Sequence, residues 1–267
     1  MPPTKERLKM NGLKKYNIER LSYSTLSNFR EKPDLWFLNK ICGYKFPSNP
    51  AMKRGNYIEE GIHAYLSEKG KIDEVCEVTT ALFEQYCKQH EYDVEKTQKE
   101  IPNIARGIKE GVKKLSQFGK PISYQKQIDI ELLGVTIRGY TDFEFLNEQT
   151  GDLFFIDLKT SSQLKKKVSF NHNCQTSIYQ RATNTPQKLL YVRTSVNPDS
   201  ILLDAENDSK YIDYLERQIK AMNLLLEKCD KEELKQLIVP NVDAFYWGEA
   251  EVKARKEVWG IWLNKYI

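Results

Sequence analysis

The sequence predicts an α/β fold, and three observations carry this prediction. Apolar residues recur at helical spacing in most of residues 21–118. Between residues 123 and 159 they alternate with polar residues instead, which is typical of strands that bury one face. Helical spacing returns from about residue 209. A single domain over residues 21–267 is the simplest organisation, although the helical part before residue 120 could form a semi-independent lobe.

The composition restricts the class of protein only loosely. The chain has 267 residues and is 40% hydrophobic, which is enough to build a core. Its 41 Lys and Arg against 37 Asp and Glu leave a formal charge of +4, which favours an anionic partner weakly. The sequence has neither a long apolar run nor the apolar core of a signal peptide, so we expect a cytoplasmic protein with no membrane partner. Its five scattered cysteines are expected to be reduced thiols.

The N-terminal part is expected to contain a lead-in and three helices. Residues 1–20 are polar and lysine-rich, as in a mobile or loosely docked segment. Residues 21–29 begin with Ser and Thr residues suited to an N-cap and predict a short helix. Residues 33–38 predict a second helix with Pro in its first turn. Residues 51–69 predict a helix of about five turns.

The 51–69 helix carries two polar residues on one face. Glu59 and His63 are four residues apart, next to an apolar stripe that contains Ile58 and Ile62. Gly55 lies one turn before Glu59. On an isolated helix, the ordinary interpretation of this pattern is a solvated Glu–His pair.

A helical insert is expected over about residues 70–120. Residues 74–91 and 101–118 have amphipathic patterns that are typical of scaffold helices. Pro102 would lie in the first turn of the second helix, where its missing N–H is tolerated. Neither pattern predicts any chemistry.

Three strands are expected after the insert. Residues 123–133 and 135–146 are joined tightly at Gly134, and residues 152–159 complete a three-stranded meander. On the middle strand, one face is polar and contains Asp142, whereas the opposite face is apolar.

The hairpin between the last two of these strands predicts an acidic site. Residues 147–151 are a polar turn that ends in glycine. If residues 148–151 form the loop, Asp142 lies directly opposite Asp157, with the two Cβ atoms about 5 Å apart. Lys159 shares the face of Asp157, and the residues between and before them point to the other face. Burying these charges together is costly unless they are paired or bind a cation.

More polar residues gather downstream of the hairpin. A loop ends in three consecutive lysines, a run that is ordinarily a solvated surface. They are Lys165, Lys166 and Lys167. Ser169 then caps a helix on which His172, Gln175 and Tyr179 lie on one side. Taken alone, this arrangement is more typical of a helix surface than of a ligand site.

The remaining elements add strands and return to helices. Residues 188–194 predict a strand, and residues 200–203 can form a further one. Helices are expected from about 209 to 229 and from 249 to the C-terminus. The last helix would carry an aromatic stripe, which is more often core than a base-stacking platform. Its members are Trp259, Trp262 and Tyr266.

Four motifs occur in the order, and on the element types, of a known family. They are Gly55-x3-Glu59, Gly139-x2-Asp142, Asp157-x-Lys159 and Gln175-x3-Tyr179. Over about residues 21–183 the chain therefore resembles the PD-(D/E)XK nuclease superfamily, and within it the RecB-type and phage exonuclease-like branch. The resemblance implies a restriction-endonuclease-like mixed central sheet flanked by helices, with additional helices at both ends of the chain.

The resemblance implies a metal-dependent DNA nuclease, in particular an exonuclease of recombination, repair or phage DNA processing in a bacterial or phage-infected cell. Hydrolysis of a phosphodiester requires charge neutralisation and hydroxide at neutral pH, which Mg²⁺ or Mn²⁺ supplies. Asp142 and Asp157 would be the anionic ligands, and the backbone carbonyl of Leu158 a neutral one. Glu59 would bind the metal directly or through water, and His63 is the competing candidate.

The other family positions concern the attacking water and the DNA. Lys159 would lie beside that water, with its protonation state left open. Gln175 and Tyr179, with His172 beside them, would hydrogen-bond to the nucleotide near the scissile phosphate. The three lysines of residues 165–167 would contact DNA phosphates. A recombination protein or a single-strand-binding protein is an open further partner.

One departure from the relatives and two alternatives complete the expectations. Some relatives bind an iron–sulfur cluster through four cysteines, but only Cys229 lies in the C-terminal region here, so no cluster is expected. One alternative is a DNA-binding or structural protein on the same fold without catalysis, which the intact Asp142, Asp157 and Lys159 disfavour. The other is a carbohydrate-active or other hydrolase with paired carboxylates, which gives no reason for the lysine.

Overall fold

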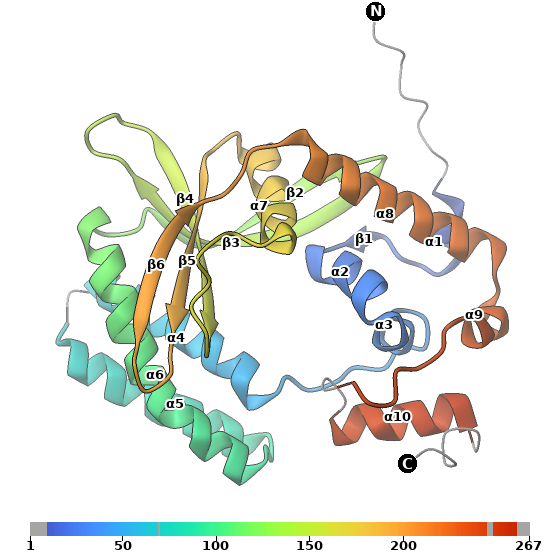
Figure 1. Ribbon diagram of the computed structural model, residues 1–267, viewed down its shortest axis with the longest axis horizontal. Helices are drawn as coiled ribbons and strands as arrows, with labels where there is room; N and C mark the ends of the chain where they lie inside the picture. Colours follow the sequence, from blue (N-terminus) through green and yellow to red (C-terminus); the bar gives the residue numbers. More distant parts are fainter. Residues whose placement is uncertain (1–9, 69, 245–247, 261–267) are drawn as a thin grey trace, which may run out of the picture. The chain divides into compact units, whose positions relative to one another are not determined.

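The computed structural model describes residues 10–68, 70–244 and 248–260 (Figure 1). Contacts divide the chain into two compact units. The sheet unit comprises Ser48–Ile128 and Tyr140–Asn207, and the helical unit comprises Asp129–Gly139 with the described residues up to Pro47 and from Asp208 onward. The organisation of residues 21–267 as one domain stays a prediction.

The strands form one mixed sheet. Their order is β1-β3-β4-β5-β6, and β2 also pairs with β3. The bounds are β1 Arg20–Leu21, β2 Ser123–Leu132, β3 Val135–Leu146, β4 Leu153–Ser161, β5 Gln187–Arg193 and β6 Asp199–Asp204. β3 is antiparallel to β4, β4 is parallel to β5, and β5 is antiparallel to β6. The sheet and its flanking helices confirm the predicted α/β fold class.

Helix α7 (Phe170–Thr183) connects the two parallel strands β4 and β5. Such a pair needs a crossover, because the chain must return to the same end of the sheet. Ser169 begins the helix as predicted, since its side chain accepts a hydrogen bond from His172 N. Asn184 ends it in the left-handed region, with φ at 52°.

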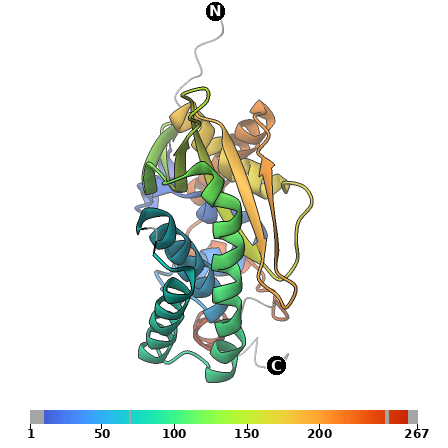
Figure 2. The ribbon, with the colours of Figure 1, turned by 90° about the vertical axis from the view of Figure 1, so that its left-hand side faces the viewer.

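The core of the sheet unit lies between its strands and three helices: α4 (Pro50–Glu68), α5 (Ile72–Gln89) and α6 (Val94–Leu115) (Figure 2). Ile58, Phe143 and Ile156 are fully buried there. Helices α4 and α6 can approach closely because Gly107 has no side chain. A Cβ at this position would lie 2.5 Å from Ile58 Cδ1. The expected insert is therefore part of the core of this unit.

The start of α6 corrects the expectation for Pro102. The side chain of Asp93 accepts a hydrogen bond from Lys96 N, so the helix begins at Val94 and Pro102 lies inside it rather than in its first turn. A proline inside a helix removes one backbone hydrogen bond. The burial of Ile104 and Ile108 on the same helix offsets this loss, because both are fully buried in the core.

The helical unit contains six helices among its described residues. They are α1 Asn11–Lys15, α2 Tyr23–Glu31, α3 Pro33–Lys40, α8 Ser209–Lys228, α9 Lys231–Leu237 and α10 Glu249–Trp259. The sequence patterns did not predict α1, α9 or the short strand β1. Helix α1 lies within the expected lead-in, yet Leu13 is only 1% exposed and Asn223 Oδ1 accepts a hydrogen bond from Gly12 N at 3.0 Å. Residues 11–15 are thus firmly docked on α8.

The aromatic stripe expected at the C-terminus is only partly described. Trp259 packs on Phe37 with ring centroids 5.5 Å apart, and its Nε1 donates to Lys235 O at 3.0 Å. It is therefore a packing residue of the helical unit. Trp262 and Tyr266 lie outside the described residues. Within the part of the chain that the structure describes, no helix is both long enough and apolar enough to cross a membrane.

Candidate active site

The β3–β4 hairpin has the register that the sequence predicts. Its paired residues run from Phe143 opposite Ile156 to Leu146 opposite Leu153, and the same register sets Asp142 opposite Asp157. Gly151 closes the turn with a φ of +75°. Side chains that are directly opposite on antiparallel strands share a face. The two carboxylates therefore come from neighbouring strands to one face of the sheet.

Asp157 and Lys159 form an ion pair on this face of β4. Lys159 Nζ lies 2.6 Å from Asp157 Oδ2, and their side chains are 25% and 3% exposed. Gln175 Nε2 on α7 is 3.4 Å from Asp157 Oδ1. Burial lowers the pKa of Lys159, but the charges of Asp157 and Asp142 outweigh it and raise this pKa above its ordinary value. Without a bound cation, Lys159 is therefore an ammonium group.

Asp142 lies where the backbone pairing of β3 and β4 ends. Its Oδ2 accepts a hydrogen bond from Leu158 N at 2.7 Å. Burial raises the pKa of Asp142 well above its ordinary value, and the charges of Asp157 and Glu59 raise it further. The negative charges of Asp157 and Glu59 thus oppose the ionisation of Asp142, a situation that a cation relieves.

Glu59 reaches this group from helix α4. The helix passes close to β4 at Gly55, where a Cβ would lie 3.3 Å from Thr160 Oγ1. Glu59 Oε1 accepts a hydrogen bond from Gln125 Nε2 of β2. Burial, followed by the charge of Asp157, raises the pKa of Glu59 to about 7 although the hydrogen bond from Gln125 opposes the change. Glu59 is therefore electrostatically linked to the hairpin.

His63, the competing candidate on α4, has a different environment. Its ring stacks on Tyr124 with centroids 4.0 Å apart, and its Nε2 lies 3.1 Å from Ser67 Oγ. Burial lowers the pKa of His63, and the charge of Lys120 lowers it further. The charges that act on Glu59 are those of Asp157 and Lys159, whereas those that act on His63 are of Lys120 and Glu68. These environments favour Glu59 over His63, and its role as a ligand stays a proposal.

Helix α7 covers the same face of β4 and β5. Gln175 Nε2 donates to the Tyr179 hydroxyl at 2.8 Å, and Tyr179 is 4% exposed. His172 Nδ1 lies 2.6 Å from the hydroxyl of Tyr191, which neighbours Lys159 across β5 and β4. Burial, with Lys159 next in size, lowers the pKa of His172 to about 3, so its imidazole is neutral.

The three lysines of the loop before α7 are exposed. They are Lys165, Lys166 and Lys167. Lys165 Nζ lies 6.0 Å from the centroid of the Tyr191 ring and contributes to the low pKa of His172. The loop thus adds positive charge next to the residues of α7, on the side of β4 that carries Asp157.

The donor set fits a hard divalent cation. Oδ2 of Asp157 is fully buried and has no hydrogen-bond partner among the described residues beyond its ion pair with Lys159. Asp142 and Asp157 supply carboxylate oxygens, and Mg²⁺ prefers a few such ligands together with water. Over residues 10–68, 70–244 and 248–260, no cluster of three or more His, Cys, Asp and Glu side chains is arranged to hold a metal by itself.

Three residues of this site were not predicted. Gln125 reaches Glu59 from β2, the ring of Tyr124 stacks on His63, and Tyr191 lies between Lys159 and His172. All three belong to segments that the sequence predicts as ordinary strands. No signal in the sequence distinguishes them, because their contacts are made with elements far away along the chain.

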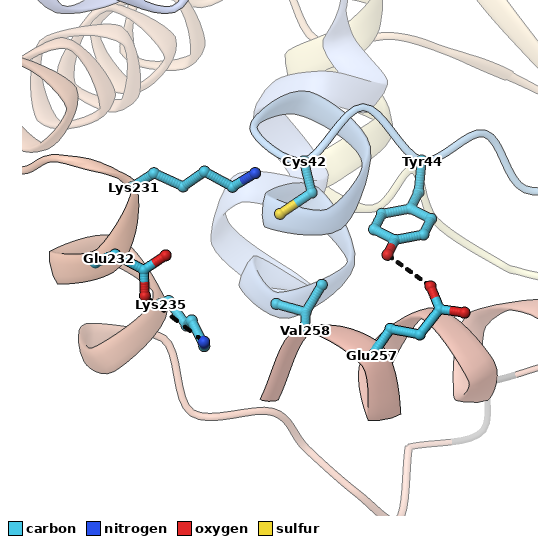
Figure 3. Close-up of a pocket in the computed structure, with 7 residues that line it drawn as sticks. All are labelled: Cys42, Tyr44, Lys231, Glu232, Lys235, Glu257 and Val258. Atoms are coloured by element: carbon cyan, nitrogen blue, oxygen red, sulfur yellow. Dashed lines mark hydrogen bonds and ion pairs between the residues drawn. The ribbon is translucent and has the colours of Figure 1, made fainter. Parts of the chain in front are cut away.

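The helical unit has an open pocket that contains none of the predicted site residues (Figure 3). Its polar lining is Cys42, Tyr44, Lys231, Glu232, Lys235 and Glu257. The two lysines and two glutamates balance in charge, and the Tyr44 hydroxyl donates to Glu257 at 2.8 Å. Burial raises the pKa of the Cys42 thiol, which keeps it in the unreactive neutral form. This pocket offers no catalytic arrangement.

Comparisons with known proteins concern the family and the fold of the chain. The family model described as PD-(D/E)XK nuclease superfamily matches residues 20–255. A crystal structure from Eubacterium rectale, described as a "Putative exonuclease", superposes with a TM-score of 0.55 at 14% identity, covering 91% of this chain and 96% of that one. A crystal structure of a protein called SSO0001 gives a TM-score of 0.34 at 14% identity, over 71% of this chain and 96% of that one. No curated protein matches the chain significantly.

Proposed function

Because this chain belongs to the PD-(D/E)XK nuclease superfamily, we propose that it is a divalent-metal-dependent deoxyribonuclease, and specifically an exonuclease in recombination, repair or phage DNA processing. One observation carries the proposal. The register of β3 and β4 sets Asp142 opposite the buried Asp157, and the ammonium group of Lys159 lies 2.6 Å from the Asp157 carboxylate. Nucleases of this family use a divalent metal. A bound cation would compensate the free-energy cost of burying these carboxylates.

The residues that would hold the metal come from three elements. Asp142 on β3 and Asp157 on β4 would be its anionic ligands, and the backbone carbonyl of Leu158 a neutral one. Glu59 on α4 would bind directly or through water, and its electrostatic link to Asp157 supports this role over His63. When bound, a divalent ion neutralises charge on the phosphate oxygens and lowers the pKa of a bound water.

Lys159 orients the attacking water or a phosphate oxygen. Its ammonium group is held by Asp157, and Tyr191 flanks it on the neighbouring strand. A charged lysine donates hydrogen bonds and stabilises negative charge that develops on the phosphate. The raised pKa supports this electrostatic role rather than proton abstraction by Lys159 in the cation-free protein.

The residues around α7 would bind the DNA strand near the scissile phosphate. Gln175 and Tyr179 hydrogen-bond to each other beside Asp157, so their remaining polar groups are held close to the reaction centre. His172 is neutral and would donate or accept a hydrogen bond without adding charge. The exposed lysines of residues 165–167 would contact phosphates and make binding salt-dependent.

The proposal includes a preference for cleavage from DNA ends over cleavage at internal sites. It takes support from the RecB-type motif pattern and from the similar fold of the Eubacterium rectale protein described as an exonuclease. At 14% identity that similarity concerns the fold alone. The activity must therefore be measured on substrates that differ only in their ends.

The test is degradation of end-labelled linear, closed circular and single-stranded DNA in Mg²⁺, Mn²⁺ or EDTA. We expect linear DNA to be degraded with either metal and not in EDTA, and Asp157→Ala and Lys159→Ala to abolish degradation. Cleavage by both variants at the parent rate would show that the site is wrong. Cleavage of closed circles would remove the exonuclease assignment but leave a nuclease. DNA binding without cleavage by the parent would favour the catalytically inactive alternative.

A further inference from the structure

Strand β2 departs from regular geometry next to Glu59. Gln125 has a φ of +50°, although it is not glycine and lies inside the strand. The left-handed region is uncommon for such residues and costs free energy unless the surroundings hold it. Outliers of this kind gather at functional sites. Contacts around Gln125 must therefore stabilise its positive φ.

The side chains around Gln125 show what the unusual backbone achieves. In a regular strand, neighbouring side chains point to opposite faces. Here the Gln125 amide donates a hydrogen bond to the carboxylate of Glu59, and the ring of the preceding residue, Tyr124, stacks on His63 of the same helix α4. Two consecutive side chains thus both contact α4, which only a break in the alternation allows.

The residues on either side confirm this break. Ser123 and Lys126 are three apart, and a regular strand would point them to opposite faces. Both nevertheless contact the carboxylate of Glu144. Tyr124 lies instead against Phe143 and His63. Interruptions like this are characteristic of β-bulges, which are over-represented beside active sites because they re-aim a side chain.

We propose that Gln125 is a positioning residue, which holds the Glu59 carboxylate toward Asp142 and Asp157 by means of this local distortion of β2. The inference rests on the proposed metal-dependent function and deepens it. Glu59 comes from a helix, and its side chain has several rotatable bonds. The amide donor of Gln125 restricts those rotations and leaves the remaining lone pairs of the Glu59 carboxylate for a cation or its water. Partners that orient a metal ligand typically change metal affinity by about 10–100-fold when they are removed.

The test measures Mn²⁺ affinity directly, from the electron paramagnetic resonance signal of free Mn²⁺, without reference to cleavage. Gln125→Asn keeps an amide and tolerates positive φ, but its shorter side chain withdraws the donor from Glu59. We expect about tenfold weaker Mn²⁺ binding. Gln125→Gly removes the donor while relaxing the backbone, so we expect the same loss with an unchanged or higher melting temperature. The matched control is Gln127→Asn, two residues along β2, with parent affinity expected.

A double-mutant cycle with Glu59→Gln tests whether Gln125 acts through Glu59. The effects of Gln125→Asn and Glu59→Gln should not add. Additive losses, or parent affinity in both Gln125 variants, would overturn the inference. If the inference fails in this way but the parent binds Mn²⁺ and the Asp157→Ala variant does not, the proposed metal-dependent function still stands. A parent that binds no Mn²⁺ would remove the proposed metal dependence and this inference with it.

Discussion

The two faces of strand β4 have opposite physical characters. One face inserts Phe154, Ile156 and Leu158 into the core beneath α4, α5 and α6. The other face carries Asp157 and Lys159, next to Asp142 on β3. Burial of the apolar face stabilises the fold by about 25 cal/mol per Å². Burial of the charged face destabilises the fold, since it raises the pKa of Asp142. The apolar face therefore stabilises the strand enough for its other face to keep the carboxylates of Asp142 and Asp157 close together despite their repulsion.

The largest effect is expected on the charged face. Asp157→Ala should lower the rate of metal-dependent DNA cleavage by about 10³-fold or more, because loss of a ligand removes several kcal/mol of charge stabilisation. The fold should persist, since the change also removes the charge that opposes ionisation of Asp142. Initial rates on end-labelled DNA and circular dichroism measure both. Asp152→Ala in the exposed hairpin turn is the matched control. Equal rates in the two variants would contradict the assignment.

The apolar face should respond in stability instead. Ile156→Ala opens a cavity at a fully buried position and should cost about 2–5 kcal/mol of unfolding free energy. Urea unfolding measures this cost. Ile122→Ala, at a position that is 57% exposed, should change stability by less than about 0.5 kcal/mol. If folded Ile156→Ala lost as much cleavage as Asp157→Ala, the two faces could not be regarded as separate.

The pH dependence of stability distinguishes Glu59 from the apolar residues of α4. The folded state raises the pKa of Glu59 from 4.5 to about 7, so the protonated carboxyl is favoured by folding. This contribution is complete below pH 4.5 and is lost as the pH rises through about 7. In EDTA, Glu59→Gln should therefore gain on the parent over this range, by about 3 kcal/mol. Thermal melts at several pH values measure the gain. A stability difference between Glu59→Gln and the parent that does not change with pH would contradict the raised pKa of Glu59.

The smallest expected effect is stabilisation by the cation. With Mn²⁺ at 100 times its dissociation constant, the parent should gain about 2.7 kcal/mol of stability. Ile156→Ala should show the same increment from a lower baseline, and Asp157→Ala should show none. Differential scanning calorimetry with and without Mn²⁺ measures these increments. If the Asp157→Ala variant shows the same increment, Mn²⁺ binds at another site.

Local sequence patterns were sufficient for the hairpin and for α7. Alternation and the glycine-terminated turn specified the register of Asp142 and Asp157, because a shift of one residue would turn Ile156 out of the core. Ser169 predicted the start of α7 for an equally local reason, its cap on His172 N. Pro102 was assigned wrongly, since the Asp93 cap lies well upstream of it.

The sequence by itself determined which residues carry charge on the β3–β4 hairpin and which face of β4 they share, because both follow from chain contacts only a few residues apart. The tertiary contacts were needed to find that the charge of Asp157 acts on Glu59 rather than on His63, and that Gln125 donates a hydrogen bond to Glu59. Those contacts join α4, β2 and β4, which lie far apart along the chain. Their geometry depends on how helices pack on a sheet and on one distorted residue of β2, and no local periodicity encodes either.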